Sequence, residues 1–250
     1  MFKQLLRLGA SKLGYEIHKR NVSETDPYLF VADIFRGHSL STILDVGAHE
    51  GSTAIRLVDA FPKASIHCFE PFDGSFQALS QVAASRPRIR THKYALADSV
   101  GKQVLYMNKF SATNSLLANS PNACEFVKGD WMDVSGISEV EAITLDAWCG
   151  KENISFIDLL KMDVQGFENR VLAGGEGMLA QGKVAAVLAE VLFAPLYQDQ
   201  CFFHEIYARM WNLGFRLAGT YELSRNSSHY LSWCDALFIH PEVLAKRVTN

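Results

Sequence analysis

The feature that most constrains the fold is a regular alternation of short apolar segments and helix-like segments, which begins near residue 42. Apolar runs typical of buried strands occur at 43–46, 65–69, 89–94, 156–162 and 184–191, and the helix-like segments cover 52–61, 76–82, 167–172 and 202–213. Two further strand-like segments, 215–220 and 236–240, follow with only a loop between them. Repeated β-α-β units require a mostly parallel sheet with helices on both faces, and strands joined by a loop can pair antiparallel. The pattern predicts an α/β, Rossmann-like, doubly wound sheet of seven strands with an antiparallel pair at one edge.

The chain is expected to divide near residue 40, into a helical extension at 1–40 and a single domain at 41–250. A length of 250 residues suits one α/β domain. Asp26 followed by Pro27 predicts a helix start, with a capping acid and then proline at the first helical position. Residues 1–20 carry five Lys or Arg and one Glu. This basic segment could contact an anionic membrane weakly, or it could cap the domain with its charged face in water.

The segment 98–155 interrupts the alternation. A strand is predicted at 102–107, and 108–122 is rich in Ser, Asn and Ala, which is typical of a long loop. Long loops in compact domains often cover or bind ligands, so we expect 108–122 to be a lid. Earlier in the chain, Asp73 is expected to cap the helix at 76–82.

The overall composition excludes several classes of protein. A net charge of −3 leaves no basic footprint for nucleic acid. The five cysteines are odd in number and contain no Cys-x-x-Cys pair, which favours free thiols in a reducing compartment over disulfides or structural zinc. No apolar run approaches the roughly 20 residues of a transmembrane helix, and the first residues make a poor signal peptide. We expect a cytoplasmic protein and leave its oligomeric state open.

The strongest local motif is Asp45-Val46-Gly47-Ala48-His49-Glu50-Gly51-Ser52-Thr53, which follows a predicted strand and opens a predicted helix. The first glycine permits a tight turn, the alanine allows a ligand to approach, and the second glycine lets helix and strand pack closely. Ligands of such sheets bind at the carboxyl ends of the strands. We therefore expect one wall of a cofactor site to contain Asp45, Gly47, Ala48, His49, Gly51, Ser52 and Thr53.

An acidic residue ends the next predicted strand. Glu70, followed by Pro71, can accept hydrogen bonds from both ribose hydroxyls of an adenosine. A dinucleotide fingerprint, G-x-G-x-x-G, would need glycine at His49 and at Ser52, and the histidine side chain would obstruct a pyrophosphate. Asp45 can instead help to hold the cationic amino group of a methionine moiety, through a water or a backbone amide. The pattern favours S-adenosylmethionine over NAD; the alternative is that Asp45 only caps a helix in a fold without a cofactor.

A second group of polar residues ends two other predicted strands. Lys161 and Asp163 lie two apart and so share a face of their strand, and Glu190 ends the next strand. Carboxylates on neighbouring strand ends can orient a hydroxyl, take its proton or hold a divalent cation. Asp163, Glu190 and Lys161 are therefore candidate catalytic residues. The alternative is a purely structural ion-pair network of Lys161, Asp163 and Glu168. No histidines have metal-ligand spacing, and no metal site is predicted.

At these positions the sequence resembles the FkbM family of methyltransferases. The matched segments are 45–51 (D-V-G-A-x-x-G), 69–71 (F-E-P), 95–101 (A-L-x-D-x-x-G), 114–116 (a loop with serine), 144–146 (T-L-D), 159–174 (L-L-K-[IM]-D-x-E-G-x-E-x-x-V-L-x-G) and 190–191 (E-V). The resemblance spans about residues 42–240 and implies a class I methyltransferase fold that binds S-adenosylmethionine. It also implies that Ala95 and Ser115 contribute to the cofactor site.

One position departs from the family pattern: Gln165 stands where the family usually has glutamate, and this removes a charge near Asp163. The resemblance implies O-methylation of a small-molecule or glycan acceptor, on a hydroxyl of a sugar, glycan or polyketide. Two other functions stay open at this point. An NAD-dependent oxidoreductase on a similar sheet lacks its second glycine here, and a non-catalytic adenosine-binding module would not need the pair of Asp163 and Glu190.

Overall fold

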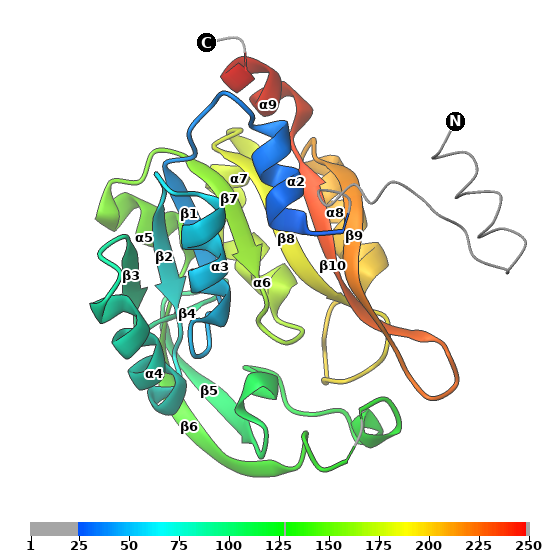
Figure 1. Cartoon of the computed structure of the whole chain (residues 1–250). Coiled ribbons are helices and arrows are strands. Elements are labelled where there is room, and N and C mark those ends of the chain that lie inside the picture. Colours follow the sequence, from blue (N-terminus) through cyan, green and yellow to red (C-terminus); the bar gives the residue numbers. More distant parts are fainter. Residues whose placement is uncertain (1–24, 128, 249–250) are drawn as a thin grey trace, which may run out of the picture.

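The computed structural model describes residues 25–127 and 129–248, and its centre is one seven-stranded sheet (Figure 1). The strands are β1 (Thr42–Val46), β2 (Ser65–Phe69), β3 (Ile89–His92), β7 (Ile157–Met162), β8 (Val184–Leu192), β9 (Arg216–Arg225) and β10 (Leu231–Ile239). Their order across the sheet is β3-β2-β1-β7-β8-β10-β9. The strands from β3 to β8 pair in parallel, whereas β10 pairs antiparallel with both β8 and β9. The predicted mostly parallel sheet with an antiparallel edge pair is confirmed.

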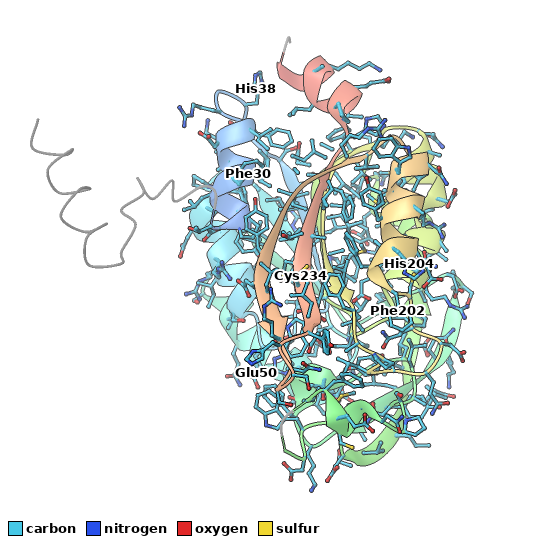
Figure 2. The ribbon with its side chains drawn as sticks, turned by 90° about the vertical axis from the view of Figure 1, so that its right-hand side faces the viewer. Phe30, His38, Glu50, Phe202, His204 and Cys234 are labelled. Carbon is cyan, nitrogen blue, oxygen red and sulfur yellow. The ribbon has the colours of Figure 1, made fainter. Side chains whose placement is uncertain are left out.

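Helices cover both faces of this sheet because successive side chains of each strand point to opposite sides. Leu160 and Met162 of β7 pack in one core with α5, α6 and α8, whereas Leu159 packs in a second core with α2, α3 and α9. Figure 2 shows Cys234 of β10 between Phe30 of α2 and His204 of α8. The helices are α2 (Pro27–Ile34), α3 (Ser52–Ala60), α4 (Asp73–Ala84), α5 (Leu145–Glu152), α6 (Glu168–Gly174), α7 (Glu176–Ala180), α8 (Phe203–Asn212) and α9 (Pro241–Val248).

A small three-stranded sheet lies beyond the carboxyl ends of the parallel strands (Figure 1). It contains β4 (Ala95–Leu96), β5 (Gly101–Asn108) and β6 (Val134–Ile143), with β6 in the middle. The prediction of a strand at 102–107 is correct, but β6 and α5 were not predicted. Most side chains of β6 are exposed, so the strand lacks the apolar alternation that marks a half-buried strand.

The segment 108–122 is more structured than the predicted loop. It contains the one-turn 3₁₀ helix η2 (Ser111–Thr113), and Ser115 pairs with Tyr106 of β5 in both directions through backbone hydrogen bonds of 2.8 and 3.2 Å. A second short turn, η3 (Ala123–Glu125), follows it. The predicted long loop is confirmed over 108–122, and its short turn and single bridges were not predicted because they carry no periodic signal in the sequence.

Two predicted helix starts have different outcomes. Asp26 caps α2, and its carboxylate accepts from the N–H of Tyr28 at 2.9 Å. Asp73 does not cap α4, because the chain already turns at Phe72, whose N–H is held by Glu70 at 2.9 Å. Asp73 is the first helical residue instead.

The predicted basic segment at 1–20 lies outside the described residues. Of the helices in the described part of the chain, none has the length and hydropathy to span a bilayer.

Candidate active site

A cavity of about 220 Å³ opens at the carboxyl ends of β1, β2 and β7. Its wall is formed by the loop after β1, the turn after β2, the segment after β7 and residues 111–116 next to the small sheet. The predicted residues in this wall are Gly47, Ala48, His49, Ser52, Thr53, Glu70, Pro71, Ala95, Ser115, Lys161 and Asp163. Asp45, Gly51 and Glu190 are not among the wall residues.

A close approach of two strand ends explains the glycine at position 47. Its φ is +76°, and a Cβ there would lie 1.9 Å from the carbonyl oxygen of Asp163. The N–H of Asp163 donates to the carbonyl oxygen of Val46 at 3.0 Å, so β1 and β7 stay joined up to the cavity. A side chain at position 47 would push the two strand ends apart. Gly51 has a different role, because it begins α3 and packs against Leu79 of α4.

The Glu70 carboxylate is fixed in the cavity wall by two backbone groups. Its Oε2 accepts from the N–H of His49 and its Oε1 from the N–H of Phe72, each at 2.9 Å. Burial raises the pKa of Glu70 to about 7, and the two N–H donors oppose that shift. Each carboxylate oxygen keeps a lone pair that can accept from a ligand hydroxyl.

His49 joins the loop after β1 to the 3₁₀ turn that covers the cavity. Its Nε2 lies 2.8 Å from Oγ of Ser111 in η2, and its backbone has a left-handed φ of 47°. Burial lowers the pKa of His49, so the ring is uncharged at neutral pH. The contact holds residues 111–116 over the cavity.

Lys161 lies between two carboxylates at the centre of the sheet edge. Its Nζ is 3.3 Å from Oδ1 of Asp45 and 3.6 Å from Oδ2 of Asp163. Burial alone would lower the pKa of Lys161, but these two carboxylates raise it, so the amine stays charged. Asp45 is completely buried beneath the cavity and is a counter-ion of Lys161; its predicted part in holding a cofactor, through a water or a backbone amide, stays a prediction. Glu168 is not part of this network, since its Oε1 accepts from the N–H of Val164 at 2.9 Å.

The two strand-end carboxylates, Asp163 and Glu190, meet on one amide. Nε2 of Gln165 donates to Asp163 at 2.7 Å and to Glu190 at 2.8 Å. The Tyr197 hydroxyl donates to Oε1 of the same amide at 2.8 Å. The predicted pair is therefore joined through a third side chain. Sequence reasoning noted Gln165 only as a departure from a family pattern and missed Tyr197, since no local motif marks the segment after β8.

Acidic groups outnumber cations around this amide. Burial raises the pKa of Glu190 well above its ordinary value, and nearby Asp163 adds to the effect. Burial also raises the pKa of Glu168 and of Asp235 to about 7 each. Asp235 lies directly opposite Glu190 in the pairing of β10 with β8. Within residues 25–127 and 129–248, no three His, Cys, Asp or Glu side chains are grouped so as to hold a metal ion.

Comparison with known proteins assigns the chain to a family. The family model described as "Methyltransferase FkbM domain" matches residues 45–217. A curated relative named "2-O-methyltransferase NoeI", from Sinorhizobium fredii (strain NBRC 101917 / NGR234), is 30% identical over 165 residues. The matched region is 63% of this chain and 66% of the relative, so it spans slightly less than two thirds of that protein.

Solved structures of methyltransferases share the general arrangement only distantly. Magnesium protoporphyrin IX methyltransferase (ChlM) from Synechocystis PCC 6803 with bound SAM has a TM-score of 0.49 and 11% identity, over 86% of this chain and 76% of that one. Aeropyrum pernix fibrillarin with natively bound S-adenosyl-L-methionine has a TM-score of 0.45 and 14% identity, over 84% and 74%. The family match, in contrast, covers more than half of the chain and includes the ends of β1, β2, β7 and β8. The chain belongs to the FkbM family of methyltransferases, whose methyl donor is S-adenosylmethionine.

Proposed function

We propose that the protein methylates a hydroxyl group of a sugar, glycan or polyketide-like acceptor. The position of Asp163 carries this proposal. Its side chain is 38% exposed and lines the cavity, whereas all residues of β7 just before it are buried. An ionised carboxylate can only accept hydrogen bonds, so it suits an acceptor that must lose a proton. The name of the relative, a 2-O-methyltransferase, supports oxygen as the methylated atom.

The wall residues fit S-adenosylmethionine, which supplies a methyl group on a positively charged sulfur when bound. Glu70 presents two fixed carboxylate oxygens, which suit the ribose hydroxyls of an adenosine. Gly47 keeps the end of β1 next to the segment after β7 in the cavity wall, because any larger residue would collide with the backbone of Asp163. Ser52 and Thr53 bring the first turn of α3 to the cavity, where a helix N-terminus favours a carboxylate. These residues, with Ala48, His49, Pro71, Ala95 and Ser115, are the proposed cofactor site.

In the proposed reaction, the acceptor oxygen forms a bond to the methyl carbon as the bond from that carbon to sulfur breaks. The hydroxyl proton passes to the Asp163 carboxylate. Lys161, with its Nζ 3.6 Å from Asp163, forms an ion pair with this base and limits its rotation. Residues 111–116 exclude water, which would compete for the base, and the enzyme's main contribution is to position the two reactants.

The test is an assay of labelled methyl transfer across sugars, glycans and polyketides, with wild type and Asp163→Asn. We expect an O-methylated product from wild type and turnover that is lower by about a hundredfold or more in the variant, the usual weight of a general base. Cofactor affinity and melting temperature should change little. Asp59→Asn, on the exposed side of α3, is the matched control and should keep full activity. A stable and fully active Asp163→Asn enzyme would remove this residue from the mechanism.

The cysteines support a cytoplasmic location, which we propose as well. All five lie within the described residues and are free, as is usual in reducing compartments. The net charge of −3 gives no support for a nucleic-acid acceptor.

A further inference from the structure

We propose that Gln165 is a positioning residue for the methyl transfer: its amide orients both strand-end carboxylates and ties them to the segment that covers the cavity. The inference rests on the proposed function, because it concerns the base that receives the acceptor proton. Gln165 lies between β7 and α6, with a left-handed φ of 56°. This backbone turn directs the short segment after β7 across the ends of both strands.

The chemistry of its neighbours fixes which way the amide faces. Asp163 and Glu190 offer oxygens that accept, and the two hydrogens of the amide nitrogen serve one carboxylate each, at 2.7 and 2.8 Å. On the other side, the Tyr197 hydroxyl donates to the amide oxygen at 2.8 Å. The amide thus satisfies two acceptors and one donor at once, whereas a rotated amide would turn its oxygen toward the two carboxylates and leave both without its hydrogens.

The same residue is held by the segment that covers the cavity. Oγ of Ser115 donates to the carbonyl oxygen of Gln165 at 2.7 Å. The Tyr197 hydroxyl also lies 3.0 Å from the carbonyl oxygen of Thr113 in η2. Tyr197 itself is 2% exposed, so its hydroxyl has little freedom to leave these partners. The position of residues 111–116 and the orientation of the Asp163 and Glu190 carboxylates are therefore linked through Gln165.

A carboxylate at position 165 would change the proton content of this centre. The carboxyl groups at positions 163, 165 and 190 would then lie within hydrogen-bond distance, and the amide hydrogens that now separate them would be lost. At least one of the three carboxyl groups would therefore bind a proton. Lys161 cannot offset the added charge, since it already serves Asp45 and Asp163. The titratable groups that surround Glu190 are Asp163, Glu168, Asp235, Lys161, Tyr197 and the Cys234 thiol, with Asp45 behind Lys161.

The experiment compares wild type, Gln165→Glu, Tyr197→Phe and the control Gln198→Glu. Gln198 is exposed in the same loop as Tyr197, and it donates to a backbone oxygen of Asn119 rather than to an acid. Carboxyl carbons are followed by NMR against pH in protein labelled at glutamate, with Glu190 assigned through Glu190→Gln. Turnover is measured against pH at saturating cofactor.

In Gln165→Glu we expect Glu190 to titrate at least about one pH unit higher, because like charges in contact disfavour ionisation. Turnover at pH 7 should fall about tenfold and recover as the pH rises, while the KM for the cofactor changes less than about twofold. Tyr197→Phe should lower turnover in the same direction but less, because the amide loses only its orienting donor. Gln198→Glu should match wild type in both measurements.

A Gln165→Glu protein whose Glu190 titrates as in wild type overturns the proposal. Turnover that falls equally at every pH also overturns it, because that result would mean a role in folding alone. The NMR titration needs no acceptor, so it remains decisive if wild type methylates no hydroxyl. Failure of the proposed function would instead appear in wild type, as the absence of any O-methylated product.

Discussion

The two halves of the sheet's carboxyl edge hold the cavity by different means. Around β1 and β2, backbone groups hold the wall of the cavity. The Glu70 carboxylate accepts hydrogen bonds from two backbone N–H groups, and Gly47 lets the end of β1 lie against the backbone of Asp163. Around β7 and β8, side chains hold it: Lys161 lies between Asp45 and Asp163, and Gln165 lies between Asp163 and Glu190. The first half provides uncharged hydrogen-bond donors in fixed positions. The second half groups acidic side chains, whose charge changes when they bind or lose a proton.

The difference fits a division between holding a cofactor and activating an acceptor. Backbone donors have fixed directions and do not titrate, so they suit a group that every reaction cycle must bind in one pose. Clustered acids have environment-dependent proton affinities, and such groups are typical of proton transfer. Variants that remove one interaction from each half can therefore test this division.

The largest effect is expected from Lys161→Met, because it leaves Asp45 buried without its counter-ion. Lys161 is 8% exposed and Asp45 is not exposed at all. Removing one partner of a buried pair costs about 3–5 kcal/mol in the free energy of unfolding. Urea denaturation measures this loss at pH 7. The matched control is Lys102→Met, whose ion pair with Glu139 lies in water and should matter little.

If Lys161→Met and Lys102→Met lowered the free energy of unfolding equally, the buried ion pair of Lys161 would not stabilise the β7–β8 half, and the comparison of the two halves would be wrong. A second comparison sharpens the result: adding Asp45→Asn to Lys161→Met should recover part of the lost stability, since no buried charge is then left unpaired.

The two halves also differ in how much the sequence reveals of them. The loop after β1 and the acid after β2 are contiguous motifs beside apolar strands, so Gly47 and Glu70 could be placed at the cavity from sequence alone. Asp163 could be placed for the same reason. The contacts of Gln165 could not, because they join residues 50 and 32 positions apart, on Ser115 and Tyr197. Only the folded chain brings these segments together.

The same contrast explains the errors in the fold. Strands buried on both faces, such as β7 and β8, are continuous apolar runs and were predicted nearly to their ends. The small sheet was largely missed, because β6 has few buried side chains and therefore no continuous apolar run in the sequence. The pairing of Asp45 with Lys161 was not predicted either, because it joins the neighbouring strands β1 and β7, which lie far apart in the sequence.

A smaller effect is expected from Glu70→Ala, which tests the backbone-held half. The variant removes the acceptor for ligand hydroxyls and also frees the N–H groups of His49 and Phe72. Loss of hydrogen bonds to a charged group should weaken binding of S-adenosylmethionine by about 1–3 kcal/mol. Calorimetric titration gives the affinity directly. The control is Glu50→Ala, at an exposed glutamate on the loop after β1, next to His49 (Figure 2), and it should bind as wild type does. Unchanged affinity in Glu70→Ala would mean that the ribose is held elsewhere.

The smallest expected effect is a pH dependence of cofactor binding that originates in the backbone-held half itself. Burial raises the pKa of Glu70 to about 7 in the free protein. Ribose hydroxyls donate to the ionised carboxylate, so binding favours the ionised form and lowers that pKa. The affinity for S-adenosylmethionine should thus be highest above pH 7 and should fall below it, by at most about tenfold per pH unit.

Glu70→Gln separates this effect from the acids near β7 and β8, which also titrate near the cavity. The amide still accepts one hydrogen bond but cannot ionise, so its affinity should be lower than that of wild type above pH 7 and should vary less between pH 6 and 8. Calorimetry in two buffers of different ionisation enthalpy would also detect proton release on binding to wild type below pH 7. If the affinity of wild type and of Glu70→Gln changes equally with pH, the titrating group belongs to the β7–β8 half. Glu70 would then be ionised at every pH tested, and titration would be confined to the β7–β8 half.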